Sequence, residues 1–508
     1  MTLYSNIFKN ALLLSAFFFS LLAYSQRDSL ELIKGAEELI LEGSRQRYLL
    51  RGKVQLKQND DRMFCDSAYY YYKSKHIYAY GNVHLNKKDT LNLFCDSLFY
   101  NSTAEYAKLW GNVRLRDNEF RLNTDSMVFD TKKFMGSYSS GGVITNSLSN
   151  EKLTSRTGTI FPKTKNFFFG GNVKYTSNDY IMETDTLEFN GYSKKAKFHG
   201  PTIIKNSTVH MYCENGWYNS ISEEGVLEKN AKVINEKQTF QADSIYYNNL
   251  NELVIGNGHV QITDSLEAVQ FFGDYAKSSE IDQIAFLSGN ALIKKYDDIN
   301  DTLFIRADSI FHFKDEDGET NKVDAFYTVS IFKNNLQGVC DSLSYIAHEG
   351  IIEMFEQPFL WLNNAQLSSD TIIIIEKNDK IDGAILKHNA LTVNEVDSLK
   401  YYDQISGKNM FAFFKENKLQ KIDVTGNAKS IYFIVDKKEN DSTITIKQQG
   451  MNRIYSSDIT IHFNDNQIQG VTYRSQPEGV LYPMNQLKAD EIKVEQFKWE
   501  IQRKPSYE

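Results

Sequence analysis

A thirty-residue repeat is the feature that most constrains how this chain can fold. An acidic residue followed by a hydrophobic, often aromatic, run recurs, and the eight steps from Glu37 to Asp274 give a period of about 29.6 residues. An element such as Gly111-Asn112-Val113 lies midway between successive acidic positions. The acidic series is Glu37, Asp66, Asp96, Asp125, Asp185, Glu214, Asp243, Asp274, Asp308, Asp341, Asp370, Asp397 and Asp458, with Arg156 in the slot between Asp125 and Asp185.

Both elements of the repeat alternate as half-buried strands do. Around Asp96 the apolar or small residues are Leu93 and Cys95 before the acid and Leu98 and Tyr100 after it, so the inward parity changes at the acid. A strand keeps both arms on one face only if it bends or bulges there. The glycine element alternates without such a change, which makes the glycine its bend. The repeat therefore predicts an all-β, antiparallel ladder of two bent strands per repeat, folded lengthwise into a V with an apolar inside.

The amino terminus predicts export. Lys9 precedes an apolar run over 11–24, and small residues precede Gln26, which is the pattern of a secretory signal cleaved near Ser25/Gln26. The run is shorter than the roughly 20 residues that span a bilayer. We expect a soluble mature protein outside the cytoplasm.

Spacing divides the rest of the chain. Residues 1–25 are the signal peptide and 26–300 the regular repeat region. From 301 to 450 the spacing loosens and a charged insertion over 314–319 predicts a longer loop. The segment 476–483 breaks the pattern, so we interpret 451–508 as a cap or docking segment.

The reactive side chains indicate structure rather than catalysis. A carboxylate repeated a dozen times marks a strand bend, where it hydrogen-bonds the backbone, because a catalytic site is normally unique. Four cysteines, Cys65, Cys95, Cys213 and Cys340, all occupy the small slot before the acid, so we expect free, buried thiols. The sequence lacks nucleophile-elbow, zinc-protease and phosphate-loop motifs. Its net charge of −8 argues against a nucleic-acid binder, which needs a dominant positive charge. We expect no enzyme activity, no cofactor, no metal and no nucleic-acid partner.

The repeat resembles the OstA family of periplasmic lipopolysaccharide-transport proteins. The resemblance rests on residues 94–100 (FCDSLFY), residues 241–247 (QADSIYY) and the Gly-Asn-Val triplets, and it covers 30–300 well and 300–475 more loosely. It implies a V-shaped β-jellyroll, or β-taco, whose apolar groove carries lipid A acyl chains through the periplasm toward the outer membrane. It also implies end-to-end strand addition to V-shaped domains of an inner-membrane anchor and an outer-membrane translocon. Head-to-tail self-association and outer-membrane association stay open.

The inward positions after the acid and beside the glycine are the candidate acyl contacts. These are Leu98, Tyr100, Leu109, Val113, Met127, Phe129, Leu187, Phe189, Ile245 and Tyr247. In the alternative interpretation the same residues interdigitate into a closed core, and the protein is an extracellular β-solenoid serving as a structural or adhesive scaffold. A secreted carbohydrate-active β-helix ranks a distant third, because the sequence shows no unique carboxylate cluster.

Overall fold

The computed structural model divides the chain into two compact units, one ending at Asn206 (unit 1) and one beginning at Ser207 (unit 2). It describes residues 30–33, 36–58, 60–87, 91–147, 149–296, 302–317, 319–334, 336–362, 365–377, 380–397, 400–415, 418–440, 443–464 and 467–506. The predicted signal peptide lies outside the described residues. The predicted divisions at 300 and 450 stay predictions.

The described residues of unit 1 form fifteen strands and one short 3₁₀ helix. They are β1 (Glu31–Leu32), β2 (Glu38–Glu42), η1 (Gly43–Arg45), β3 (Arg47–Gln58), β4 (Asp61–Tyr71), β5 (His76–Lys87), β6 (Leu91–Asn101), β7 (Tyr106–Arg116), β8 (Phe120–Asp130), β9 (Met135–Tyr138), β10 (Gly142–Asn146), β11 (Lys152–Ser155), β12 (Thr157–Phe161), β13 (Asn166–Thr176), β14 (Ile181–Asn190) and β15 (Lys195–Lys205).

Unit 2 is built the same way. Its elements are β16 (His210–Asn219), β17 (Glu224–Ile234), β18 (Gln238–Asn248), β19 (Leu253–Asp264), β20 (Val269–Ser279), β21 (Ile284–Tyr296), β22 (Thr302–Lys314), β23 (Thr320–Lys333), β24 (Leu336–Ile346), β25 (Ile351–Phe355), β26 (Phe359–Leu362), β27 (Ala365–Ser368), β28 (Thr371–Lys377), β29 (Lys380–Asp397), β30 (Tyr401–Lys415), β31 (Lys418–Asn440), β32 (Thr443–Asn464), β33 (Gln467–Arg474), β34 (Glu478–Pro483), η2 (Met484–Gln486) and η3 (Ile501–Arg503).

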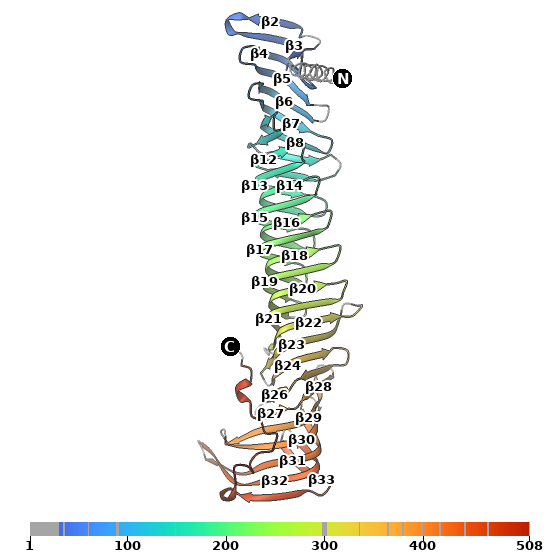
Figure 1. The fold of residues 1–508 in the computed structure, drawn as a ribbon, viewed down its shortest axis with the longest axis vertical. Helices are drawn as coiled ribbons and strands as arrows, with labels where there is room; N and C mark the ends of the chain where they lie inside the picture. The colour runs from blue at the N-terminus through green and yellow to red at the C-terminus, as the bar shows by residue number, and fades with distance from the viewer. Residues whose placement is uncertain are drawn as a thin grey trace, which may run out of the picture. The chain divides into compact units, whose positions relative to one another are not determined.

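Within each unit, strands that follow one another along the chain pair antiparallel and lie side by side (Figure 1). Several bent strands are interrupted at the bend, so that β9 and β10, or β25 and β26, are the two arms of one strand. The predicted all-β ladder, a β-jellyroll of the V-shaped β-taco type with two strands per repeat, is confirmed.

The bend of each repeat is a β-bulge. Strands β6 and β7 pair as Ser97↔Trp110 on one side of it and Phe94↔Arg114 on the other, and the register shifts between them. Gly111 and Asn112 are both left-handed, with φ of 78° and 49°. The same glycine-first pair recurs at positions 81, 171, 258, 289 and 426. Two consecutive left-handed residues turn the strand, so the predicted corner is confirmed at the glycine as well as at the acid.

The side chains of the acidic series bridge these corners by hydrogen bonds on the outer side of the V. The Asn112 side chain donates to Asp96 over 2.8 Å, and Asn82 donates to Asp66 over 2.9 Å. Corresponding bonds join Asn230 to Glu214, Asn290 to Asp274 and Asn389 to Asp370. The acid therefore bonds mainly to the asparagine side chain at the second left-handed position of the next corner, where we expected backbone donors. The acidic series is therefore structural, as expected, but its main hydrogen-bond partner is a side chain and not the backbone.

One member of the predicted acidic series is wrong. Asp397 ends strand β29 and pairs with Tyr401 across a hairpin turn, away from any corner. The corner slot of this repeat is Lys408, against which a side chain on Gly426 would lie and beside which the register shifts between Ser406 and Asn409. The 18-residue strand β29 moves the corner beyond the position that a constant period gives.

The carboxyl-terminal segment 484–506 packs back onto the ladder. Gln404 donates to the carbonyl of Ile492 and accepts from the amide of Val494, and Gln366 holds Lys498 and Glu500 in the same way. Both glutamines are buried, at 0% and 1% exposure. The segment joins Val494, Phe497 and Trp499 to Tyr402, Phe433 and Met451 in a hydrophobic cluster. The segment thus covers the outer face of these strands.

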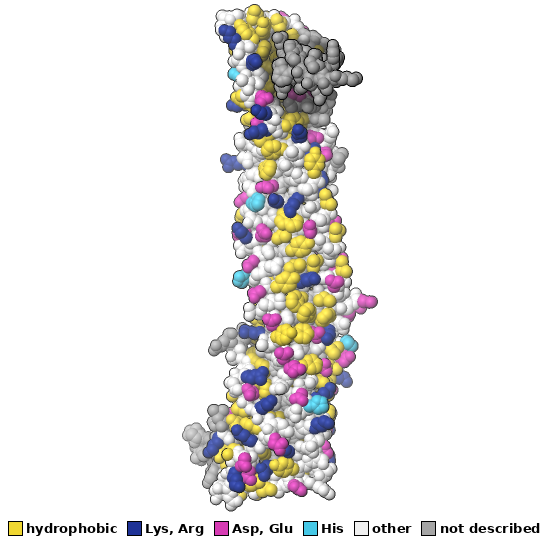
Figure 2. Space-filling model, in the orientation of Figure 1, with side chains coloured by type: hydrophobic (Ala, Val, Ile, Leu, Met, Phe, Trp, Pro, Cys, Tyr) yellow, Lys and Arg dark blue, Asp and Glu magenta, His cyan; other side chains and the backbone are white. Residues whose placement is uncertain are grey.

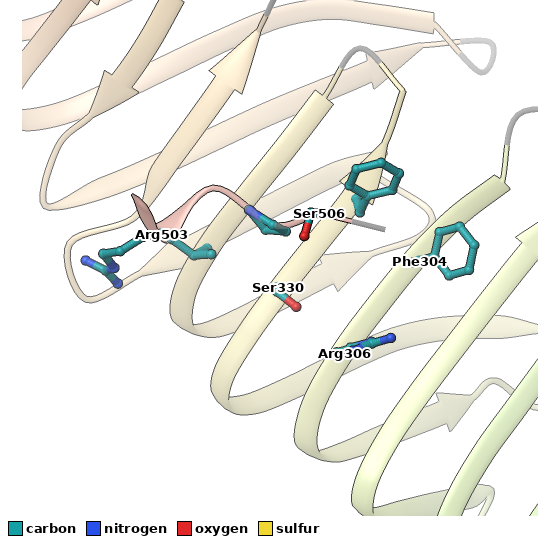
Figure 3. A pocket seen from close by; sticks show the side chains of 8 residues that line it. Phe304, Arg306, Ser330, Arg503 and Ser506 are labelled. Atoms are coloured by element: carbon teal, nitrogen blue, oxygen red, sulfur yellow. The ribbon is translucent and has the colours of Figure 1, made fainter. Parts of the chain in front are cut away.

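Figure 3 shows where this segment ends. A cavity of about 230 Å³ lies between Arg503 and Ser506 of the segment and Phe304, Arg306 and Ser330 of strands β22 and β23. Arg306 pairs with Ser330 on the face opposite to buried Ala307 and Val329. The cavity is therefore outside the V.

Candidate functional site: the apolar inner faces

Each repeat contributes two arms to the V. Arm A holds the residues before the acid and after the glycine, as in 91–95 and 113–116. Arm B holds the residues after the acid and before the glycine, as in 97–101 and 106–110. Because cross-strand partners share a face, the strand register identifies which side chains line the inside.

The inner row of arm A in unit 1 is continuous and apolar. Cross-strand pairing connects Leu56, Met63, Leu85, Leu93, Leu115, Leu122, Ile144, Leu153 and Tyr175. Leu115 and Leu122 are fully buried. No charged side chain interrupts this row, so its interior surface is apolar from β3 to β13.

The ten predicted contact residues all lie on inner faces. Leu98, Leu109 and Met127 form one cross-strand row, and Tyr100 and Phe129 flank Ala107 in the next. Val113 lies on arm A beside the corner, opposite Thr124. Leu187 and Phe189 lie on β14, and Ile245 and Tyr247 lie in unit 2, so the structure does not bring them to the first group.

Their burial depends on depth in the V. Seven are buried: Leu98, Leu109, Val113, Met127, Phe129, Leu187 and Ile245. Of the four candidates that lie four residues after an acid, Tyr100, Phe189 and Tyr247 are half-buried, whereas Phe129 is buried. The positions beside the bend are thus packed by their own side chains, and three of the four positions farther along arm B keep accessible apolar surface.

A cavity of about 80 Å³ opens between the two arms in unit 1. Its apolar lining comes from both arms: Leu30, Leu56, Met63, Ile77, Leu85, Leu93, Tyr100, Ala107 and Phe129. Gln58, Asp61, Arg62, Asn86 and Thr131 complete the lining with polar side chains. An apolar cleft with a polar margin suits an amphiphile.

In unit 2 the inner row of arm A stays accessible over a longer distance. It runs through Met211, Val233, Phe240, Ile262, Phe271, Ile293 and Ile305, all half-buried. On arm B, burial and nearby Lys314 lower the pKa of inward-facing His312 below its usual value. The ring is therefore neutral near pH 7, and it adds no charge to the groove.

Sequence reasoning missed part of this lining. It selected the residues after the acid and beside the glycine, but the cavity also uses Met63 and Leu93, three residues before their acids. The alternation had marked that slot as inward. Leu30 lies before the first full repeat, and no periodic signal identifies it.

The four cysteines are free and buried, as expected from their slot. Burial raises the pKa of each thiol to about 12. Among the described residues, no cluster of side chains has the composition of a metal site. In the same part of the chain, no helix is long and apolar enough to cross a bilayer.

We expect these thiols to resist alkylation in the native protein at pH 8, because the thiolate is the reacting species and a pKa of about 12 leaves roughly one thiol in ten thousand ionised. Mass spectrometry after iodoacetamide treatment should find four modified cysteines only when guanidinium is present. Rapid native modification of Cys95 would contradict its assigned burial.

Comparison with known proteins agrees with the predicted resemblance over part of the chain. Residues 32–185 match the family model described as OstA-like protein. A search of curated proteins finds no match to the chain. Among solved structures, the chain is similar to the crystal structure of LptH, described as the LptA homologous periplasmic component of the conserved lipopolysaccharide transport device from Pseudomonas aeruginosa. That similarity has 14% identity and a TM-score of 0.19, and it covers 22% of this chain and 75% of LptH.

Proposed function

We propose, from the premise that residues 32–185 are OstA-like, that the protein is a periplasmic lipopolysaccharide-binding transport protein. Its inner faces would form a passive apolar groove that carries lipid A acyl chains toward the outer membrane, as part of a bridge across the envelope. The observation that carries this proposal is the uninterrupted apolar inner row, with accessible side chains at the arm tips and a cleft between the arms.

The energetics favour such a groove. Moving an acyl chain of about 14 carbons through water costs roughly 11 kcal/mol at about 0.8 kcal/mol per methylene. Along a continuous apolar row, an acyl chain that moves forward exchanges one apolar contact for another. The row therefore removes most of the free-energy cost of exposing the chain to water. The groove would guide the acyl chains, and the energy for their directed movement would come from another protein.

The terminal strands support end-to-end partners. Among the described residues, β2 pairs only with β3, and its Leu39, Ile40 and Leu41 are 42–58% exposed. In unit 2, within the described part of the chain, β33 and β34 pair only with β32, and they expose Ile468 and Leu481. Unpaired edges of this kind accept a strand from another chain. We propose V-shaped domains of an inner-membrane anchor and an outer-membrane translocon as those partners.

Photocrosslinking tests the groove directly. Benzoylphenylalanine at Tyr100 or Tyr247 should crosslink to lipopolysaccharide in the periplasm. Phe99 and Tyr246 are matched controls, because they are adjacent, aromatic and half-buried but face outward. Equal crosslinking from inner and outer positions would reject the groove, and mass spectrometry of lipids retained on gentle purification gives an independent readout.

A filled-core scaffold remains the second candidate, because seven of the ten predicted contact residues are buried. Periplasmic export is common to both proposals. The scaffold predicts no crosslink from Tyr100 or Tyr247 and no co-purifying lipid.

A further inference from the structure

A cationic row follows the outer side of arm A in unit 1. Cross-strand pairing connects Lys57, Arg62, Asn86, Asn92, Arg116, Arg121, Thr145, Lys152 and Thr176. Five of these nine positions are basic and none is acidic, in a chain of net charge −8. We call this set the basic lip.

The basic lip lies beside the groove. Each member is next in sequence to a residue of the apolar inner row, as Arg62 is to Met63 and Arg116 is to Leu115. Arg62 lines the cleft between the arms together with Met63. Figure 2 shows Lys and Arg side chains over strands β3–β8 on its visible face. At Arg62, positive charge and apolar surface therefore meet at the margin of the cleft.

The arrangement is costly for the protein alone. Lys57 lies directly opposite Arg62, and Arg116 lies opposite Arg121. Like charges in facing positions destabilise a sheet. In the described part of the chain, none of the five basic residues forms an ion pair with a carboxylate.

The two carboxylates in the turn beside Arg116 and Arg121 are bound to another cation. Asp117 and Glu119, in the turn between Arg116 and Arg121, bind Lys165 at 2.9 and 3.5 Å. Arg116 instead lies over the Phe94 ring, at 5.4 Å from its centre, as Arg114 does. Phe94 stacks in turn on His84 and His84 on Phe64, so a column of rings holds these two guanidinium groups in place. Arginines fixed in this way present donors to an external anion.

We infer that the basic lip binds the phosphate groups of an anionic amphiphile whose acyl chains enter the cleft between the arms. This inference rests on the proposed function and specifies its substrate class: phosphorylated lipids are preferred over neutral ones. The lip selects the head group, and the inner rows accept the chains.

The test compares three probes on the full mature chain: dodecyl phosphate, dodecyl maltoside and inorganic phosphate. We expect dodecyl phosphate to bind about tenfold more tightly than the maltoside, since charge-assisted bonds add to the same apolar contact. The preference should shrink as salt is raised, because exposed charges are screened. Inorganic phosphate should bind far more weakly than dodecyl phosphate.

Substitutions test whether the basic lip causes the preference for dodecyl phosphate over dodecyl maltoside. The triple variant R62Q/R116Q/R121Q should lose the preference and keep its affinity for the maltoside, and replacement of the same three residues by Lys should retain most of it. K108Q/K133Q/K197Q removes three exposed cations from elsewhere in unit 1 and should behave as the wild type.

Each contrary result has a distinct meaning. Equal binding of the two detergents by the wild type, or an unchanged preference in the R62Q/R116Q/R121Q variant, overturns the lip and leaves the groove standing. Inorganic phosphate binding as tightly as dodecyl phosphate also overturns it, since the site would then be one for free phosphate. Binding of neither detergent overturns the proposed function and the lip together.

Discussion

Replacing Met127 by Ala is expected to lower the free energy of unfolding of the strands around β8 by about 2–5 kcal/mol. Met127 is 3% exposed and lies in the inner row of arm B, opposite Leu109. Truncation removes its buried methylenes and leaves a cavity, because the cross-strand backbone cannot close around it. Hydrogen exchange of residues 120–130 in the full chain measures the loss where it arises, which matters because repeat proteins unfold region by region.

Val128→Ala is the matched control for this prediction. Val128 is the next residue on the same strand, but it faces outward and is 44% exposed. Its truncation should change protection by no more than about 0.5 kcal/mol. Comparable losses in the two variants would show that the alternation across β8 is assigned wrongly.

Gly111→Ala is expected to destabilise its corner by about 1–2 kcal/mol from the left-handed backbone alone. Gly111 has a φ of 78°, and a β-carbon there would press against the Asp96 carboxylate. The corner must then open or the carboxylate must leave Asn112. We expect lower protection of β6 and β7 against hydrogen exchange.

Two further variants separate the causes. Gly43→Ala is the control, since Gly43 has no atom within 4 Å of the added carbon and no left-handed φ. Asp96→Ala combined with Gly111→Ala should relieve the clash with the carboxylate and leave both the backbone part and the contact with the β-carbon of residue 96, at 2.8 Å. A neutral Gly111→Ala variant would mean that this glycine is not the bend.

The corner could be predicted because its causes are local. A parity change at Asp96 and a glycine at Gly111 are both visible in a short stretch of sequence, and period-two alternation then assigns each side chain to a face. Spacing was less reliable where strands lengthen. β29 runs for 18 residues, so the acid expected at Asp397 lies at the end of that strand and the corner is at Lys408.

The candidate site was predictable in part for the same reason. Inward positions follow from alternation, but how deep each side chain lies depends on the opposing arm, which no single repeat encodes. Leu98 and Tyr100 are two residues apart in one inner series, yet one is fully buried and the other is half-buried. The cationic row was also invisible, because Arg62, Arg116 and Lys152 become neighbours of one surface only through register.

The return of the carboxyl-terminal segment has a consequence for biogenesis. Most strands pair with a neighbour made shortly before them, so the ladder can assemble in order as the polypeptide emerges. Gln366, by contrast, waits for Lys498 and Glu500, more than 130 positions later. Until residues 498–503 are made, the outer side of Phe359 lacks the Arg503 side chain that lies over its ring, so a prematurely terminated product would be prone to aggregation and a target for proteolysis.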